Sequence, residues 1–183
     1  MASSSPYIVI LDTCVLAPMP LCDTLLRVAE DPAYYVPKWS NDILRELRST
    51  LQRMGYTVSQ ADRRIMAMET AFDDANVTGY EALTASMTNH PKDRHVLAAA
   101  VRSGAHAIVT ANVKHFPVES AKPFGLEILT PDDFLVQQFH LNQQVLGEKI
   151  SGQAAARGVS VADLLGRLSQ WAPGAARLIA RGP

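Results

Sequence analysis

The sequence contains few cysteines, almost no net charge and no long apolar run. Its two cysteines, Cys14 and Cys22, lack the spacing of a zinc site and fit a protein kept in a reducing compartment. The formal net charge of -1 excludes a global basic field, so any nucleic-acid binding has to use local cations. No apolar stretch is long enough to span a membrane, and the first residues lack the basic segment of a signal peptide. We therefore expect a cytoplasmic protein with no membrane segment.

The apolar residues that are present suffice for one packed domain with an appendage. They make up 48% of the 183 residues, which is too much for a disordered chain. The runs 7–11 and 107–110 have the pattern of strands buried on both faces, and strands alternate with helical periodicity as far as Leu129. This predicts an α/β fold, a three-layer sandwich with a mainly parallel central sheet flanked by helices. From Phe134 onward only helical signals remain, so we expect a domain over 1–135 and a C-terminal helical extension over 136–183.

Several elements can be predicted from local signals. We expect a strand at 34–36 closed by Pro37, a helix over 41–54 capped by Ser40, a helix capped by Ser59, extended chain over 76–83, and a helix opened by Pro91 and ended by Gly104. In the extension, apolar residues repeat at helical spacing and need a partner surface, either the body or a second subunit of a homodimer. These residues are Leu164, Leu165, Leu168 and Trp171.

The first candidate for a functional residue is Asp12, directly after the run 7–11. A carboxylate at the carboxyl end of a central parallel strand points into the crevice where open α/β sheets bind ligands. The alternative is that Asp12 only caps the turn that follows it. Other carboxylates in the same crevice would favour the functional interpretation.

Two later acids, Asp93 and Glu46, are expected to face that crevice. Asp93 precedes the apolar positions of its helix by three, four and seven residues, so it lies in the first turn on the buried face, where a carboxylate loses hydration energy. Glu46 borders the apolar stripe of the helix 41–54. Ordinary roles stay open for both: a favourable interaction with the helix dipole for Asp93, and an ion pair with Arg45 or Arg53 for Glu46.

Three carboxylates in one crevice predict a bound cation. Their mutual repulsion would raise at least one pKa, and a hard divalent ion removes that conflict. Ligation by oxygen atoms suits Mg²⁺ or Mn²⁺, which lower the pKa of a bound water and stabilise a leaving oxygen in phosphoryl displacement. The sequence has no glycine-rich phosphate loop, zinc signature or nucleophilic triad, and Cys14 occupies the place of the second aspartate of a haloacid dehalogenase.

Four motifs, in this order, resemble the PIN-domain family over about residues 7–135, with the greatest similarity to the VapC-like toxins of bacterial toxin–antitoxin operons. The motifs are Val-Ile-Leu-Asp-Thr-Cys-Val-Leu (9–16), Trp-Ser-Asn-Asp-Ile-Leu-Arg-Glu-Leu (39–47), Asp-Arg-His-Val-Leu-Ala-Ala-Ala (93–100) and Ile-Val-Thr-Ala-Asn-Val-Lys-His-Phe-Pro (108–117). The resemblance implies a PIN-like nuclease domain over 1–135. It also implies a Mg²⁺- or Mn²⁺-dependent endoribonuclease that hydrolyses RNA phosphodiesters and has a cognate antitoxin as its protein partner.

The resemblance also implies roles for individual residues. Asp12, Glu46 and Asp93 match the family's three metal-binding acids, and Thr110 matches the hydroxyl residue that helps to hold the first acid. Asn112 stands where many members have a fourth aspartate, so it is a weak ligand at most.

Two histidines depart from the family pattern in the same region. His115 and His90 stand at positions that are often acidic in the family. The departures at Asn112 and His115 remove negative charge from the side of a second metal, which leaves open one ion or two. They also leave open a PIN-like module that binds RNA or a partner protein without cutting. A metal-dependent DNA nuclease is a third alternative, because metal-activated water does not require a 2′-hydroxyl.

Local cations are the candidates for RNA contact. Lys92, Arg94, Lys114 and His115 are expected near the mouth of the crevice, where they can contact phosphates, although ordinary solvated charges would look the same in the sequence. His95 lies inside its helix and is expected to pack or to bond locally.

Overall fold

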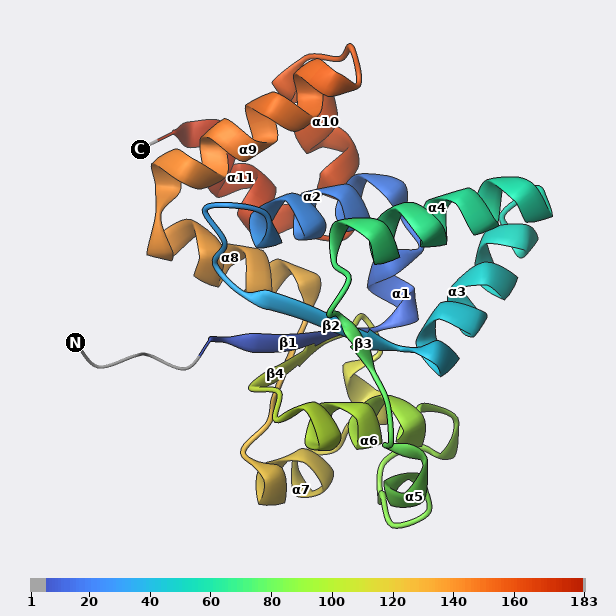
Figure 1. The fold of residues 1–183 in the computed structure, drawn as a ribbon. Helices are drawn as coiled ribbons and strands as arrows, with labels where there is room; N and C mark the ends of the chain where they lie inside the picture. Colours follow the sequence, from blue (N-terminus) through green and yellow to red (C-terminus); the bar gives the residue numbers. More distant parts are fainter. Residues whose placement is uncertain (1–5, 183) are drawn as a thin grey trace.

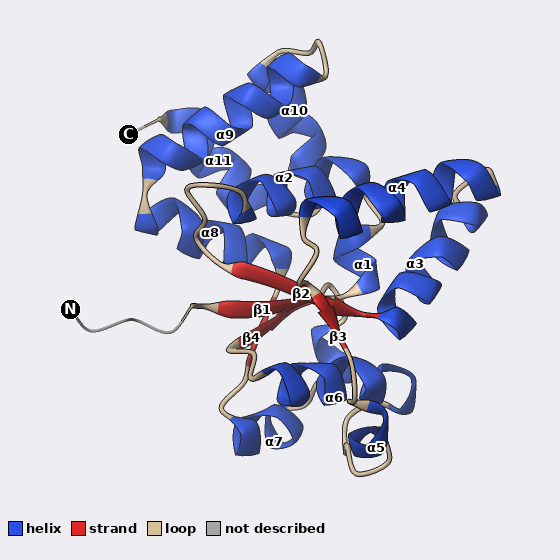
Figure 2. Cartoon of the chain, in the orientation of Figure 1, coloured by secondary structure: helices blue, strands red, loops and turns tan. Residues whose placement is uncertain are grey.

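The computed structural model describes residues 6–182, and a five-stranded sheet lies at its centre (Figure 2). The strands are β1 (Ile8–Leu11), β2 (Val36–Ser40), β3 (Asn76–Val77), β4 (Ala107–Val109) and β5 (Glu127–Leu129). Their order is β3-β2-β1-β4-β5, and every neighbouring pair is parallel. The sheet is therefore parallel throughout, which sharpens the prediction of a mainly parallel one.

Helices cover both faces of this sheet. The helices of the described residues are α1 (Thr13–Leu16), α2 (Met19–Ala29), α3 (Asn41–Arg53), α4 (Val58–Ala71), α5 (Glu81–Thr84), α6 (Arg94–Ser103), α7 (Val118–Ala121), α8 (Pro131–Leu141), α9 (Gln143–Ala156), α10 (Val161–Leu168) and α11 (Pro173–Arg181). Three 3₁₀ turns accompany them, η1 (Pro91–Asp93), η2 (Val113–His115) and η3 (Lys122–Phe124). Figure 1 shows α6 and α7 on one side of the sheet and α2 and α8 on the other. The predicted three-layer α/β sandwich is confirmed.

The middle of the sheet places two polar residues side by side at its carboxyl edge. Val9, Ile10 and Leu11 are fully buried, as expected for a strand covered on both faces. Leu11 is paired with Val109 of β4, so both strands end at the same level. The residue after each strand is polar, Asp12 after β1 and Thr110 after β4. The register of these two strands is therefore what brings Asp12 and Thr110 together.

The C-terminal helices form a further layer outside α2 and α8. Helices α9 and α10 contact α2, and α11 contacts α8 (Figure 1). Buried polar bonds fix this contact, because Thr24 Oγ1 of α2 donates to Gln153 Oε1 of α9 at 2.8 Å. The apolar residues of the extension that needed a partner surface belong to the same hydrophobic core as the sheet. Their packing onto the body is thus confirmed.

The second strand begins later than its sequence suggested. It starts at Val36, not at residue 34, and continues through Pro37 to Ser40. Tyr35 is used in the core instead, where its hydroxyl donates to the carbonyl of Leu25 at 2.8 Å. Pro37 has no backbone N–H to donate to a neighbouring strand. This is tolerated because β3 begins only opposite Trp39, so no strand lies beside Pro37 on that side.

Three local predictions also need correction, whereas the caps at Ser40 and Gly104 are confirmed. The cap of α4 is Thr57, not Ser59, because Thr57 and Gln60 complete a reciprocal capping box. The extended chain predicted over 76–83 ends at Val77. The residues after Pro91 form a 3₁₀ turn before α6 begins, and this turn sets Asp93 at the helix entrance. Within residues 6–182, no helix has the length and apolar character needed to cross a membrane.

Candidate functional site

Asp12 is the most buried acid of the candidate site. Only 3% of the surface of Asp12 is exposed, and its backbone N–H donates to the carbonyl of Val109 at 3.1 Å. Its Oδ2 accepts hydrogen bonds from Thr110 Oγ1 at 2.7 Å and from Cys14 Sγ at 3.1 Å. The side chain is therefore held by Cys14 of α1 and by Thr110, the residue that follows β4, as the family resemblance implied for Thr110.

Burial raises the pKa of the Asp12 carboxyl, because desolvation penalises its charged form. The hydrogen bonds from Thr110 and Cys14 oppose this rise, and the negative charge of Asp93 adds to it. Burial and the charge of Asp93 therefore both disfavour the ionised form of Asp12. A cation between the two acids would relieve both the burial cost and the repulsion.

Glu46 reaches the site from α3 and is held by two neighbours. Its Oε2 accepts from Thr13 Oγ1 at 3.2 Å, and its Oε1 lies 3.1 Å from His95 Nε2 of α6. The hydrogen bond with His95 lowers the pKa of Glu46, although partial burial opposes the change. Burial lowers the pKa of His95, but the bond and the charge of Glu46 outweigh it, so the pKa of His95 is raised. The alternative pairing of Glu46 with Arg45 or Arg53 is not found, because these arginines bond to Asp42 and Thr50. His95 is packed, with its side chain 12% exposed, and it bonds to α3 rather than within its own helix.

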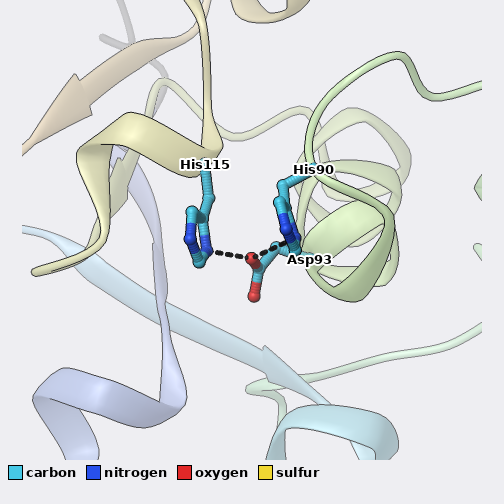
Figure 3. Close-up of side chains that lie close together, drawn as sticks. All are labelled: His90, Asp93 and His115. Atoms are coloured by element: carbon cyan, nitrogen blue, oxygen red, sulfur yellow. Dashed lines mark hydrogen bonds and ion pairs between the residues drawn. The ribbon is translucent and has the colours of Figure 1, made fainter.

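Asp93 stands between two histidines at the entrance of α6 (Figure 3). Its Oδ2 lies 2.6 Å from His115 Nδ1 and 3.7 Å from His90 Nδ1. The two imidazole rings are stacked, with their centroids 4.2 Å apart and their planes 15° apart. His115, proposed from the sequence as a phosphate contact, thus meets Asp93 directly.

Two of these acids, Glu46 and Asp93, border one cavity of about 480 Å³ at the carboxyl edge of the sheet. The residues that line it are Thr13, Arg45, Glu46, Ser49, Thr50, Arg53, Lys92, Asp93, Asn112 and His115. Asp12 does not line the cavity itself but precedes the lining residue Thr13. Among the described residues, the group of potential ligands that converges within 4.8 Å is His90, Asp93 and His115 rather than the three acids. The structure therefore brings Glu46, Asp93 and Asn112 to one cavity, with Asp12 buried beside it.

Three cations line this cavity, and the sequence indicated only one of them for that role. Lys92 was expected there, but Arg45 and Arg53 of α3 had been considered only as partners of Glu46. The helical spacing does carry a signal, because Arg45 and Arg53 are eight residues apart and so share one face of the helix with Ser49 between them. Arg45 is bonded to Asp42 at 2.7 Å and Arg53 to Thr50 at 2.9 Å.

The other two predicted cations lie outside the lining. Arg94 Nε donates to the carbonyl of Asn89 at 3.4 Å, and Lys114 is exposed. Neither side chain therefore contacts the cavity directly.

The arrangement offers oxygen donors in a cationic surrounding. Carboxylates from Glu46 and Asp93 and the side-chain amide of Asn112 face the cavity, and Asp12 lies behind it. Oxygen ligands are the donors that Mg²⁺ and Mn²⁺ prefer. The arginines and the lysine on the rim would attract a phosphate-bearing ligand.

Comparisons with known proteins agree with this architecture. A family model described as PIN domain matches residues 8–114, which is more than half of the chain. A protein of Mycobacterium tuberculosis named "Putative ribonuclease VapC50" is 45% identical to the chain over 111 residues. That match covers 57% of this chain and 66% of the relative, which is just under two thirds of the relative's length. No solved structure matches the chain at the corresponding level. With its parallel sheet, its acids at the carboxyl edge and this family match, the chain belongs to the PIN-domain family.

Proposed function

We propose that the chain is a divalent-metal-dependent endoribonuclease and the toxin of a type II toxin–antitoxin pair. The observation that carries this proposal is that acids from three separate elements gather at the carboxyl edge of the sheet. Two of them line a cavity rimmed by cations, and the third is buried beside it. Asp12 follows β1, Glu46 lies on α3, and Asp93 precedes α6. Membership of the PIN-domain family and the printed name of the Mycobacterium tuberculosis relative support the same function.

We assign the metal ligands to Asp12, Glu46 and Asp93, with Asn112 as a weak fourth. The fit rests on the donor set, which consists of oxygen atoms, and on the charge conflict that burial and Asp93 impose on Asp12. A bound Mg²⁺ or Mn²⁺ would supply an activated water and charge stabilisation for the leaving oxygen.

The remaining residues orient these groups and the substrate. Thr110 and Cys14 fix the Asp12 carboxylate, and Thr13 and His95 fix that of Glu46. A phosphodiester would be drawn to the rim cations, which in the structure are Arg45, Arg53 and Lys92. Arg94, Lys114 and His115 stay candidates for contacts with the flanking nucleotides.

The proposal is tested by a nuclease assay on matched RNA and DNA strands with Mg²⁺, with Mn²⁺ and with chelator. We expect RNA cleavage only when metal is present. Asp93→Asn and Glu46→Gln should each lower it by more than the about 10–100-fold typical of residues that support a metal ligand. Glu69→Gln, on an exposed position of α4, is the matched control and should cleave like the wild type. Cleavage that survives both site substitutions would contradict the assignment.

The same assay separates the two rivals. A PIN-like module that binds RNA or a partner without cutting is favoured by Asn112 in an often acidic position and by the imidazoles already bound to Glu46 and Asp93. It predicts RNA binding with no cleavage in any metal. A DNA nuclease predicts cleavage of the DNA strand as well.

The proposed partner is a cognate antitoxin, and the proposed site of action is the cytoplasm, where cellular RNA is the substrate. Expression of the chain alone should arrest growth, and coexpression with the product of the adjacent reading frame should restore it. Light scattering of the purified chain decides whether it forms a homodimer. Growth that is unaffected by an active enzyme would argue against a toxin but not against the nuclease.

A further inference from the structure

One side of the candidate site carries a different set of potential ligands. His90, Asp93 and His115 each offer an atom to a group within which all separations are at most 4.8 Å (Figure 3). Within residues 6–182, no other group of three histidine, cysteine or acidic side chains meets this criterion. The three-acid set uses Asp93 alone of these residues, so the two histidines have no role in it.

The separations suit a single ion after small movements. Ligand atoms that bind one ion at about 2.1 Å lie roughly 3.0–3.4 Å apart in octahedral or tetrahedral geometry. Asp93 Oδ2 lies 2.6 Å from His115 Nδ1 and 3.7 Å from His90 Nδ1, which brackets this range. The rings are stacked nearly parallel, so rotation of His90 about its side-chain bonds is needed to aim its nitrogen at the ion. The His90 side chain is 41% exposed and has room to rotate.

The backbone holds these residues together without a metal. The N–H of His90 donates to the carbonyl of His115 at 3.0 Å, which joins the two segments. The N–H of Asp93 donates to the carbonyl of His90 at 2.9 Å, and Asn89 Nδ2 donates to the carbonyl of Asp93 at 3.0 Å. The N–H of Lys92 donates to His90 Nδ1 at 3.3 Å, so this nitrogen is an acceptor and would exchange that donor for the ion when the ring rotates. Preorganisation of this kind lowers the cost of assembling a ligand set.

We infer that His90, Asp93 and His115 form a three-ligand site for a divalent transition metal ion of the zinc class. Two imidazoles and one carboxylate are the donors that Zn²⁺, Co²⁺ and Fe²⁺ accept readily, whereas Mg²⁺ prefers oxygen ligands alone. The remaining positions of the ion face the cavity that His115 and Asp93 line, where water or a phosphate oxygen can bind. The inference goes beyond the proposed nuclease, because metal binding at this site does not require RNA cleavage.

The test is a titration of the metal-free full chain with Zn²⁺ by calorimetry and with Co²⁺ by visible absorption. The wild type should bind one Zn²⁺ tightly, excess Mg²⁺ should not displace it, and Co²⁺ should give the absorption of nitrogen ligation. His90→Ala and His115→Ala should each lower the Zn²⁺ affinity more than the about 10–100-fold typical of a residue behind a ligand. Glu69→Gln, on an exposed position of α4, and His140→Ala, on α8, should bind Zn²⁺ like the wild type.

Each other outcome overturns the inference. The inference fails if the wild type does not bind Zn²⁺, if binding survives both histidine substitutions, or if binding is lost equally in His140→Ala. Circular dichroism and a metal-free melt check that the variants fold. If His115→Ala unfolds, the exposed His90 still carries the test. The nuclease assay in Mg²⁺ is scored separately, so a chain that binds Zn²⁺ without cutting RNA refutes the proposed function and keeps this site.

Discussion

At the scale of single residues, two of the three acids in the candidate site each lie beside an imidazole ring. Glu46 and Asp93 each lie within 3.1 Å of a histidine nitrogen, whereas the buried Asp12 is held by uncharged hydroxyl and thiol groups. Negative charge at Asp12 therefore has no cation beside it, which agrees with its raised pKa. This asymmetry makes Asp12 the acid for which a bound metal would matter most.

Substitution of Glu46 should change the titration of His95. The hydrogen bond and the charge of Glu46 raise the pKa of His95 above its ordinary 6.5 against the effect of burial, so Glu46→Gln should lower that pKa. The ring-proton resonance of His95, followed by NMR as a function of pH, measures it. Glu69→Gln is the control, and an unchanged His95 titration in Glu46→Gln would contradict the paired geometry.

The same pair sets a window of pH for its contribution to stability. His95 has a raised pKa, so its contribution is lost as the pH rises through that pKa, which lies above 6.5. Glu46 has a lowered pKa, so its contribution is lost as the pH falls through that pKa, which lies below 4.5. Because the Glu46 side chain is 47% exposed, we expect the pair to contribute only about 0.2–1 kcal/mol within this window.

The residues of the site could be predicted from the sequence only in part. Asp12 could be placed because a strand ends before it, and Asp93 because a helix begins after it. Their partners could not, because His95 lies 49 residues from Glu46 and His115 lies 22 residues from Asp93. Such contacts follow from the packing of separate elements, which one sequence does not encode locally.

At the scale of elements, boundaries were harder to predict than the elements themselves. The helix α4 was expected, but Thr57 and Ser59, two residues apart, are both candidate N-caps. Thr57 is the cap because the Gln60 side chain accepts a hydrogen bond from its backbone N–H and so completes a capping box. The strand β2 was expected, but Tyr35 is drawn into the core, where its ring also packs edge-on against Phe134 at 4.9 Å. Local propensity thus located these elements, and tertiary contacts decided where they begin.

The acid Asp132 has a larger role than its position in the first turn of α8 indicated. Its carboxylate accepts from the backbone N–H groups of Gly174 at 3.1 Å and Ala175 at 2.8 Å, so it caps the start of α11. Gly174 allows this approach, because an added Cβ would lie 2.8 Å from Asp132 Oδ2. One side chain of α8 therefore supplies the cap that α11 lacks in its own sequence.

Removal of this cap should destabilise the whole chain. We expect Asp132→Ala to cost about 1–2 kcal/mol, a lowering of the melting temperature by roughly 2–8 °C. A thermal melt followed by circular dichroism measures the change. Asp73→Ala, an exposed acid beyond α4, is the matched control and should melt within a degree or so of the wild type. Equal melting of the two variants would show that the cap contributes nothing.

At the scale of the whole molecule, the C-terminal helices share the core of the sheet. The boundary expected after residue 135 lies inside α8, which runs continuously to Leu141. We propose the division between α8 and α9, at Asn142. Across it, Leu146 and Ile150 of α9 are buried in the same apolar cluster as β1, so the two parts should unfold together.

A chain that ends at Asn142 should therefore aggregate or melt at a lower temperature. It would expose the face of α2 that α9 and α10 cover, and it would leave the buried Thr24 without Gln153. Calorimetry of the full chain should show a single transition, with light scattering as the measure of association for the truncated one. A truncated chain that stays monomeric with unchanged melting would establish two independent units.

The rate at which the thiol of Cys14, beside Asp12, is alkylated can measure how often the crevice opens. Burial and the charge of Asp12 raise the pKa of Cys14 to about 12, so its thiolate is scarce and alkylating reagents should react only when the crevice opens. Cys22, buried in α2, reports openings of the helical layer instead. Comparison of the labelling rates of Cys14 and Cys22 would therefore show whether the carboxyl edge of the sheet, which holds the acids, opens independently of the core. A cation bound to Asp12 should slow the label at Cys14 while leaving that at Cys22 unchanged.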